Sequence, residues 1–194
     1  MKNQLVLDIG GVLAENITPF WKRLSGESQT AEELFALFNR EVREELWSGG
    51  MTEKYFWERF AERFPNIPAE NARESMIASI TPLPAIKEIP RWSRYADIHL
   101  LSNHRTEWIM PIVNTISDYV TSVTISSEAG CCKPSAPIYS VVNAKLGLER
   151  PILFIDDQEK NMKEARAIGW QTLIADVEGR WIAEAERYLL GGEK

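Results

Sequence analysis

The sequence predicts an α/β fold, in which a doubly wound parallel sheet forms the core and a small all-helical segment is inserted after the first strand. Between residues 82 and 194, short apolar runs alternate with helical stretches, a pattern typical of a parallel sheet covered by helices. Residues 15–81 show only helical periodicity. The 194 residues suit one domain with a small insertion. We therefore expect a core of residues 1–14 plus 82–194, interrupted by a helical insertion of residues 15–81.

The first strand is expected at Leu5–Asp8, an apolar run that ends on a carboxylate. Such a run is typical of a buried parallel strand, which would bring Asp8 to the carboxyl edge of the sheet, where open α/β sheets bind ligands. Gly10 and Gly11 follow at once and allow the backbone to turn tightly beside a ligand. An ordinary strand and surface turn would look the same, so the later segments decide between the two interpretations.

Helical patterns fill the inserted segment. Thr30–Glu33 has the spacing of a capping box, and apolar residues recur behind it at helical spacing until Gly49 and Gly50 end the helix. Thr52 is expected to cap a second helix with aromatic residues on one face. A third helix is expected over residues 69–80. These aromatic stripes are more typical of a packed core than of a ligand site.

The alternating pattern begins after Pro82 and Pro84, which indicate a stiff crossing from the insertion back to the core. From there, apolar runs predict strands and amphipathic stretches predict helices. The predicted strands are 97–101, 122–125, 151–155 and 171–175, and the predicted helices are 106–116, 135–146, 161–168 and 179–190.

The overall composition excludes several classes of partner. The net charge is −6 and the isoelectric point is about 5.1, so nucleic acid and anionic membranes are poor candidates. No apolar run approaches the roughly 18 residues of a membrane helix, and the N-terminus has no signal-peptide pattern. Cys131 and Cys132 are the only cysteines and are adjacent. We therefore expect a reduced, cytoplasmic protein without a Cys-based metal site.

Four groups with catalytic potential stand at or just after predicted strand ends: Asp8, Ser102, Lys133 and the pair Asp156–Asp157. Because the carboxyl ends of parallel strands lie on one edge of a sheet, these groups can converge. Two or three carboxylates suit Mg²⁺, which takes oxygen ligands, while a lysine and a hydroxyl suit the charge of a phosphate. Each group alone also has a structural interpretation, as a helix cap or a solvated charge.

Four short motifs extend this pattern over nearly the whole chain. They are Asp8-Ile-Gly-Gly-Val12, Leu100-Leu-Ser-Asn103, Cys132-Lys-Pro134 followed by Ile138-Tyr139, and Phe154-Ile-Asp-Asp157 followed by Asn161. On these motifs the chain resembles the haloacid dehalogenase (HAD) superfamily of aspartate-nucleophile phosphatases. The resemblance implies a Rossmann-like core, and residues 15–81 look like the family's small helical cap. The first motif resembles a branch with Asp-x-Gly-x-Val, whose members include sugar-phosphate phosphatases.

The resemblance also implies roles for the matching residues. Asp8 would attack phosphorus and form an aspartyl-phosphate. Mg²⁺ would be held by Asp8, the carbonyl of Gly10 and Asp156, with Asp157 acting through a water molecule. Lys133 would neutralise the phosphoryl charge and restrain Asp8. The residues implied for phosphate binding are Gly10, Gly11, Ser102, Asn103 and Lys133. The implied activity is hydrolysis of a small organic phosphate monoester, with sugar phosphates among the candidates.

One position departs from the pattern of the family. Most of its phosphatases carry a second Asp two residues after the nucleophile, which protonates the leaving group, and here that position is Gly10. General acid–base help is worth about 10²–10⁴-fold in rate, so its absence matters. Three explanations compete: a leaving group that needs little help, such as an anomeric sugar oxygen; a substitute acid, with His104 and Glu15 as candidates; or a slow or inactive enzyme.

Other functions compete with a phosphatase. A dehalogenase of the same superfamily also lacks the second Asp, but it needs no metal, so the pair Asp156–Asp157 argues against it. A non-catalytic binding protein is supported only by Gly10. A phospho-receiver module is disfavoured because its acidic pair precedes the phosphorylated Asp, whereas here the pair comes last. The expected partner is a small phosphate ester, and neither its identity nor the oligomeric state can be deduced from the sequence.

Overall fold

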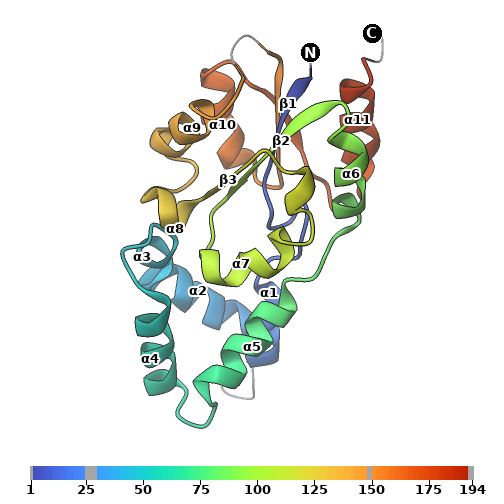
Figure 1. Ribbon diagram of the computed structural model, residues 1–194. Helices are drawn as coiled ribbons and strands as arrows, with labels where there is room; N and C mark the ends of the chain where they lie inside the picture. The colour runs from blue at the N-terminus through green and yellow to red at the C-terminus, as the bar shows by residue number, and fades with distance from the viewer. Residues whose placement is uncertain (1, 25–29, 148–149, 192–194) are drawn as a thin grey trace.

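A computed structural model describes residues 2–24, 30–147 and 150–191. The predicted domain ranges also include residues that lie outside the described part of the chain, namely 1, 25–29, 148–149 and 192–194. The centre is a parallel five-stranded sheet with the strand order β3-β2-β1-β4-β5 (Figure 1). Its strands are β1 (Asn3–Leu7), β2 (Ala96–Ser102), β3 (Ser122–Ile125), β4 (Ile152–Asp156) and β5 (Gln171–Ile174). The predicted parallel sheet is thus confirmed, with strand ends shifted by one or two residues.

Helices cover both faces of the sheet (Figure 1). One face carries α9 (Ala136–Asn143) and α10 (Glu159–Ala167), and the other carries α6 (Ile89–Trp92), α7 (Thr106–Val113) and α11 (Arg180–Leu189). Side chains alternate along a strand, so Val6 packs on the first face while Leu5 and Leu7 pack on the second. All three are fully buried. The continuous apolar run of β1 therefore reflects a strand that is covered on both sides.

The segment between β1 and β2 is helical and lies beyond the carboxyl ends of the strands (Figure 1). Its helices are α1 (Thr18–Leu24), α2 (Ala31–Glu41), α3 (Arg43–Trp47), α4 (Glu53–Arg63) and α5 (Ala69–Ser79). Thr30 and Thr52 cap α2 and α4 as predicted, each accepting a hydrogen bond from a backbone N–H three residues on. The prediction of one helix between Thr30 and Gly49 was wrong at Val42, a weak helix former whose φ of −136° separates α2 from α3.

Several short elements were not predicted. They are the 3₁₀ turns η1 (Pro84–Glu88) and η2 (Ser117–Tyr119) and the helices α6 and α8 (Ser126–Ala129). Each has five residues or fewer, too few to show a helical period in the sequence. Pro84 and Pro90 stand in the first turns of η1 and α6, where a missing N–H costs little. Among the described residues, none of the helices is long and apolar enough to cross a membrane.

Gly49 allows the insertion to approach the core closely. Its φ is +81°, and a Cβ at this position would lie 2.2 Å from the carbonyl oxygen of Ser127 in α8. No other residue type could occupy this position without displacing a backbone. The glycine that was expected only to end a helix therefore also permits the contact between α3 and α8.

Candidate active site

The carboxyl ends of two neighbouring strands bring acidic side chains around one buried lysine. Asp8 directly follows β1, and Asp156 ends β4, which pairs with β1. Lys133, in the loop between α8 and α9, places its Nζ 2.7 Å from Asp8 Oδ2 and 2.6 Å from Asp156 Oδ2. The side chain of Lys133 is 1% exposed and that of Asp156 is 0% exposed. These ion pairs are therefore shielded from water. Charges in such a buried environment interact far more strongly than charges on the surface.

Asp157 completes a group of three carboxylates. Oxygen atoms of Asp8, Asp156 and Asp157 all lie within 4.8 Å of one another. Gly11 makes room for the third carboxylate, because a Cβ at position 11 would lie 2.5 Å from Asp157 Oδ2. Three carboxylates beside one lysine leave an excess of negative charge, and carboxylate oxygens are the ligands that Mg²⁺ prefers. The residues present therefore fit a magnesium ion.

Replacing Gly11 with Ala should weaken the binding of Mg²⁺. The new Cβ would collide with the Asp157 carboxylate, which must then move away from the other two carboxylates. Changes next to metal ligands typically cost about 10–100-fold in metal affinity, and we expect a loss in this range by titration calorimetry. Gly130→Ala is the matched control, because Gly130 has a similar φ of +71° but no heavy atom within 4 Å of a Cβ. Equal Mg²⁺ affinities of the two variants would contradict the prediction.

Two asparagines hold these groups in position. Asn103, directly after β2, donates from Nδ2 to the Lys133 carbonyl and accepts at Oδ1 from the Lys133 N–H, both at 2.8 Å. Asn161, in α10, donates from Nδ2 to both carboxylate oxygens of Asp156 at 2.9 Å. The loop that carries Lys133 and the carboxylate of Asp156 are thus fixed by the protein itself, which is a property of preorganised sites.

Burial and the lysine set the ionisation of the cluster. Burial, reinforced by the neighbouring carboxylates, raises the pKa of Asp8 to about 7, against the opposing effect of Lys133. Burial also acts to raise the pKa of Asp156, but the ion pair with Lys133 and the hydrogen bonds that Asp156 accepts outweigh it and lower that pKa. Burial opposes the charged form of Lys133, yet its two carboxylate partners raise its pKa. Lys133 therefore remains a cation, and Asp156 remains an anion, at neutral pH.

A pocket of about 430 Å³ opens over this cluster, a volume that suits a small organic molecule. From the sheet edge it is lined by Asp8, Gly10, Ser102, Asn103, Lys133, Asp157, Gln158, Lys160 and Asn161, among others. The insertion contributes Asn16, Ile17, Thr18, Phe35, Phe38, Asn39, Arg43 and Trp47. Of the predicted site residues, Asp156 and Gly11 do not line the pocket. Asp156 contacts Lys133, which does line the pocket. Gly11 leaves the space that the Asp157 carboxylate occupies.

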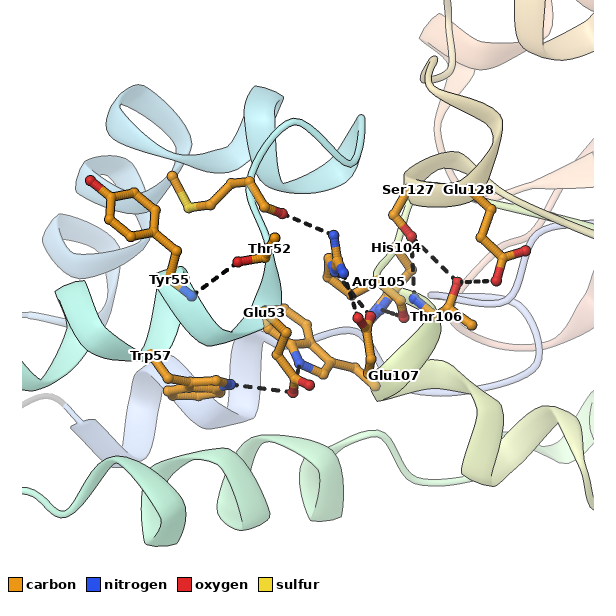
Figure 2. A network of polar contacts seen from close by, with 12 residues as sticks. Thr52, Glu53, Tyr55, Trp57, His104, Arg105, Thr106, Glu107, Ser127 and Glu128 are labelled. Carbon is orange, nitrogen blue, oxygen red and sulfur yellow. Dashed lines mark hydrogen bonds and ion pairs between the residues drawn. The ribbon is translucent and has the colours of Figure 1, made fainter.

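Polar contacts join the insertion to the core beside the pocket (Figure 2). Glu53, at the start of α4, accepts hydrogen bonds from Trp57 Nε1 at 3.3 Å and from Trp108 Nε1 of α7 at 2.6 Å. Arg105 donates from Nη1 to the carbonyl of Met51 at 2.9 Å. Because the contacts of Glu53 with Trp108 and of Met51 with Arg105 are partly or fully buried and join the insertion to the core, they fix the insertion relative to the sheet edge.

The two candidate replacements for the missing acid differ in position. His104 lines the pocket and stacks on Trp47, with ring centroids 5.0 Å apart. Burial lowers the pKa of His104 to about 4, so its imidazole is neutral at pH 7 and is a poor acid. Glu15 lines a separate cavity of about 320 Å³ and does not line the pocket around Asp8. Neither residue has both the position and the protonation state that the missing Asp would supply.

Comparisons with protein-family models and with curated protein sequences found no match. Solved structures do match. A predicted HAD-like hydrolase from Porphyromonas gingivalis has a TM-score of 0.78 at 20% identity over 100% of both chains. A HAD-family enzyme from Bacteroides thetaiotaomicron, in complex with magnesium and inorganic phosphate, has a TM-score of 0.76 at 21% identity over 93% of this chain and 98% of the other.

Dehalogenases also share the architecture. L-2-haloacid dehalogenase from Xanthobacter autotrophicus, with chloropropionic acid covalently bound, has a TM-score of 0.65 at 15% identity over 99% of this chain and 84% of the other. At these identities the likeness establishes the fold. This protein therefore has the α/β fold of HAD-family enzymes, as its four motifs predicted, and the helical insertion after the first strand agrees with the helical pattern of its sequence.

Proposed function

We propose that this protein is a Mg²⁺-dependent phosphatase that hydrolyses a small organic phosphate monoester through an aspartyl-phosphate on Asp8. The observation that carries the proposal is the group of three carboxylates, with oxygens within 4.8 Å of one another, beside the buried cation of Lys133. Such a group suits a divalent cation, which phosphoryl transfer needs and a metal-independent dehalogenase does not. A HAD-family enzyme of the same fold was solved with magnesium and inorganic phosphate, which supports the same interpretation.

The chemistry begins with Asp8. One of its carboxylate oxygens would form a bond to phosphorus while the ester P–O bond breaks, and the departing alkoxide would take a proton from water. A second water would then attack phosphorus, which releases phosphate and restores the carboxylate. Two like unit charges 4 Å apart repel by about 4 kcal/mol at an effective dielectric of 20, so an anionic carboxylate needs help to approach an anionic phosphate.

That help is assigned to the residues around Asp8. Lys133 already contacts its carboxylate at 2.7 Å and would neutralise phosphoryl charge. Bound Mg²⁺, held by Asp8, the Gly10 carbonyl and Asp156, with Asp157 acting through water, would offset the remaining negative charge. The proposed phosphoryl-binding groups are the Ser102 hydroxyl and the backbone around Gly10, Gly11 and Asn103. Residues 15–81 would act as a cap over the core formed by residues 1–14 and 82–194.

Gly10 restricts the kind of substrate. A phosphatase without an acid two residues after its nucleophile has no side chain there to protonate the leaving group. Esters whose leaving oxygen is stable as an anion, such as the anomeric oxygen of a sugar, lose least from this absence. The proposal therefore favours sugar 1-phosphates and similar esters over phosphates of simple alcohols.

Mg²⁺ dependence tests the proposal. We expect the protein to release phosphate from at least one member of a panel of metabolite phosphates when Mg²⁺ is present, and EDTA to abolish this release. The same preparation should be assayed on 2-haloacids. Turnover of a 2-haloacid that resists EDTA would overturn the phosphatase in favour of a dehalogenase. If neither class of substrate is turned over, a binding protein with this fold is favoured.

A further inference from the structure

Two basic side chains that line the active-site pocket form no ion pair with any acidic residue that the structure describes. Arg43, at the start of α3, and Lys160, in α10, both line the pocket over Asp8. Within the part of the chain that the structure describes, neither forms a hydrogen bond or an ion pair. By contrast, Arg105, where the insertion meets the core, is paired with Glu107. Unpaired cations on the wall of a pocket are available to an anionic ligand.

Arg43 and Lys160 act on each other, although one belongs to the insertion and the other to the core. Burial lowers the pKa of Lys160, and the charge of Arg43 lowers it further. Arg43 is half-buried, which strengthens this repulsion compared with two solvated charges. An anion bound between the two side chains would turn the unfavourable pair into a favourable triad.

Neither cation forms an ion pair with the groups around the nucleophile, although the charges of Asp156, Asp157 and Lys133 also act on the pKa of Lys160. Besides burial, the charges that most affect the pKa of Asp8 are those of Lys133 and of the other two carboxylates. Neither Arg43 nor Lys160 is among them. A phosphoryl group at Asp8 would therefore be neutralised by Lys133, whereas Arg43 and Lys160 would meet the part of the substrate that extends away from phosphorus.

The same wall of the pocket has an unpaired amide. Asn39, near the end of α2, also lines the pocket. Its Oδ1 atom is buried and has no hydrogen-bond partner among the described residues. A buried amide oxygen without a partner costs free energy, which a hydroxyl of a ligand would recover. The wall contributed by the insertion thus combines aromatic side chains with a cation and an unpartnered amide oxygen.

We propose that Arg43 and Lys160 bind a second anionic group of the substrate, a carboxylate or a further phosphate carried by the leaving group. The inference rests on the proposed phosphatase function and narrows its substrates to phosphate monoesters of anionic compounds. A pocket of about 430 Å³ admits such a molecule only if it is small. Asn39 would accept a hydrogen bond from a hydroxyl of the same leaving group.

Three phosphonates that differ only at one end test this subsite. Propylphosphonate, 3-phosphonopropionate and ethane-1,2-diphosphonate carry a methyl, a carboxylate or a second phosphonate on the same two-carbon spacer. Each is titrated into the protein by calorimetry with Mg²⁺ present. We expect the two ligands with a second anion to bind at least about tenfold more tightly than propylphosphonate, since two charge-assisted contacts are added. The tighter of the two identifies the second anion as carboxylate or phosphate.

Variants separate this subsite from the rest of the pocket. In the double variant Arg43→Gln, Lys160→Gln, the affinities for the two ligands with a second anion should fall to the affinity for propylphosphonate. Lys163→Gln is the matched control, because Lys163 is exposed in the same helix and does not line the pocket. It should keep the preference.

The outcomes distinguish the two proposals. Equal affinity of the wild type for all three phosphonates overturns the second-anion subsite alone, as does a preference that survives in the double variant. If none of the three phosphonates binds in the presence of Mg²⁺, the proposed phosphatase function is overturned, and the subsite with it.

Discussion

Replacing Asp8 with Asn should abolish the release of phosphate from esters while leaving the fold intact. An amide cannot serve as the nucleophile toward phosphorus, and removing the nucleophile of a hydrolase can cost about 10⁶ in kcat. We expect a loss of at least about 10³-fold at saturating Mg²⁺, measured as phosphate release from the best substrate of the metabolite panel. A loss of this size would arise from the chemical step, provided that the variant is folded.

The local structure predicts that the variant will be folded. The Ile9 N–H donates to Asp8 Oδ1 at 2.7 Å, and an amide oxygen can accept the same hydrogen bond. Lys133 keeps its contact with Asp156 at 2.6 Å. Because burial raises the pKa of Asp8 to about 7, the fold gains little from the charge at this position. We expect the free energy of unfolding to change by less than about 1 kcal/mol in a denaturant titration.

Asp97→Asn is the matched control for this variant. Asp97 is an aspartate of β2 that accepts a hydrogen bond from Gln4 Nε2 at 3.0 Å and does not line the pocket. Its replacement should leave phosphate release near the wild-type rate. Substantial release by Asp8→Asn, or an equal loss in Asp97→Asn, would show that Asp8 is not the nucleophile.

The sheet could be predicted from the sequence because its central strands contain short apolar runs, Leu5–Leu7 in β1 and Ile152–Ile155 in β4. Because these strands are buried on both faces, the inner part of each run is apolar without alternation. The order of the strands also determines which carboxylates meet, since β1 lies between β2 and β4. By contrast, the break at Val42 and the short helix α6 depend on packing and proline geometry, which a hydrophobic period does not record.

The groups at strand ends could be predicted, but the wall of the pocket could not. Asp8 and Asp156 follow apolar runs in the sequence, and the structure brings both to Lys133. Arg43 and Lys160 carry no such signal, because charged residues are common on solvated helix faces. The position of Arg43 depends on the break before α3. The contacts between the insertion and the core then fix the side of the pocket on which Arg43 lies. Pocket walls built by insertions are set by tertiary contacts.

Replacing Lys133 with Met should both destabilise the protein and stop catalysis. The side chain is 1% exposed and joins Asp8 to Asp156. Without it, the three carboxylates stay close together, within 4.8 Å, and have no cation between them. Removing one partner from a buried ion pair typically costs about 3–5 kcal/mol of unfolding free energy. We expect a loss of this order in EDTA at pH 7.5, and partial recovery with Mg²⁺, because a cation that binds only the folded state stabilises it.

The pH dependence of this loss follows from the carboxylates. Without Lys133, the folded-state pKa of Asp8 should rise further above its unfolded value of about 3.8, and the pKa of Asp156, which Lys133 holds low, should rise as well. A carboxyl group with a raised folded-state pKa binds more protons in the folded state, so stability falls as pH rises above the unfolded pKa. The deficit should therefore be smallest near pH 4 and largest above pH 7.

Lys145→Met and a double variant complete this experiment. Lys145 donates to the Val123 carbonyl and the Thr124 hydroxyl, which are uncharged partners, so its loss should cost less than about 1 kcal/mol at every pH. Adding Asp8→Asn to Lys133→Met removes one of the uncompensated charges and should restore part of the lost stability, a non-additive result expected for groups in direct contact. A deficit in Lys133→Met that does not change with pH or with Asp8→Asn would mean that packing, rather than charge, is the main contribution of this lysine.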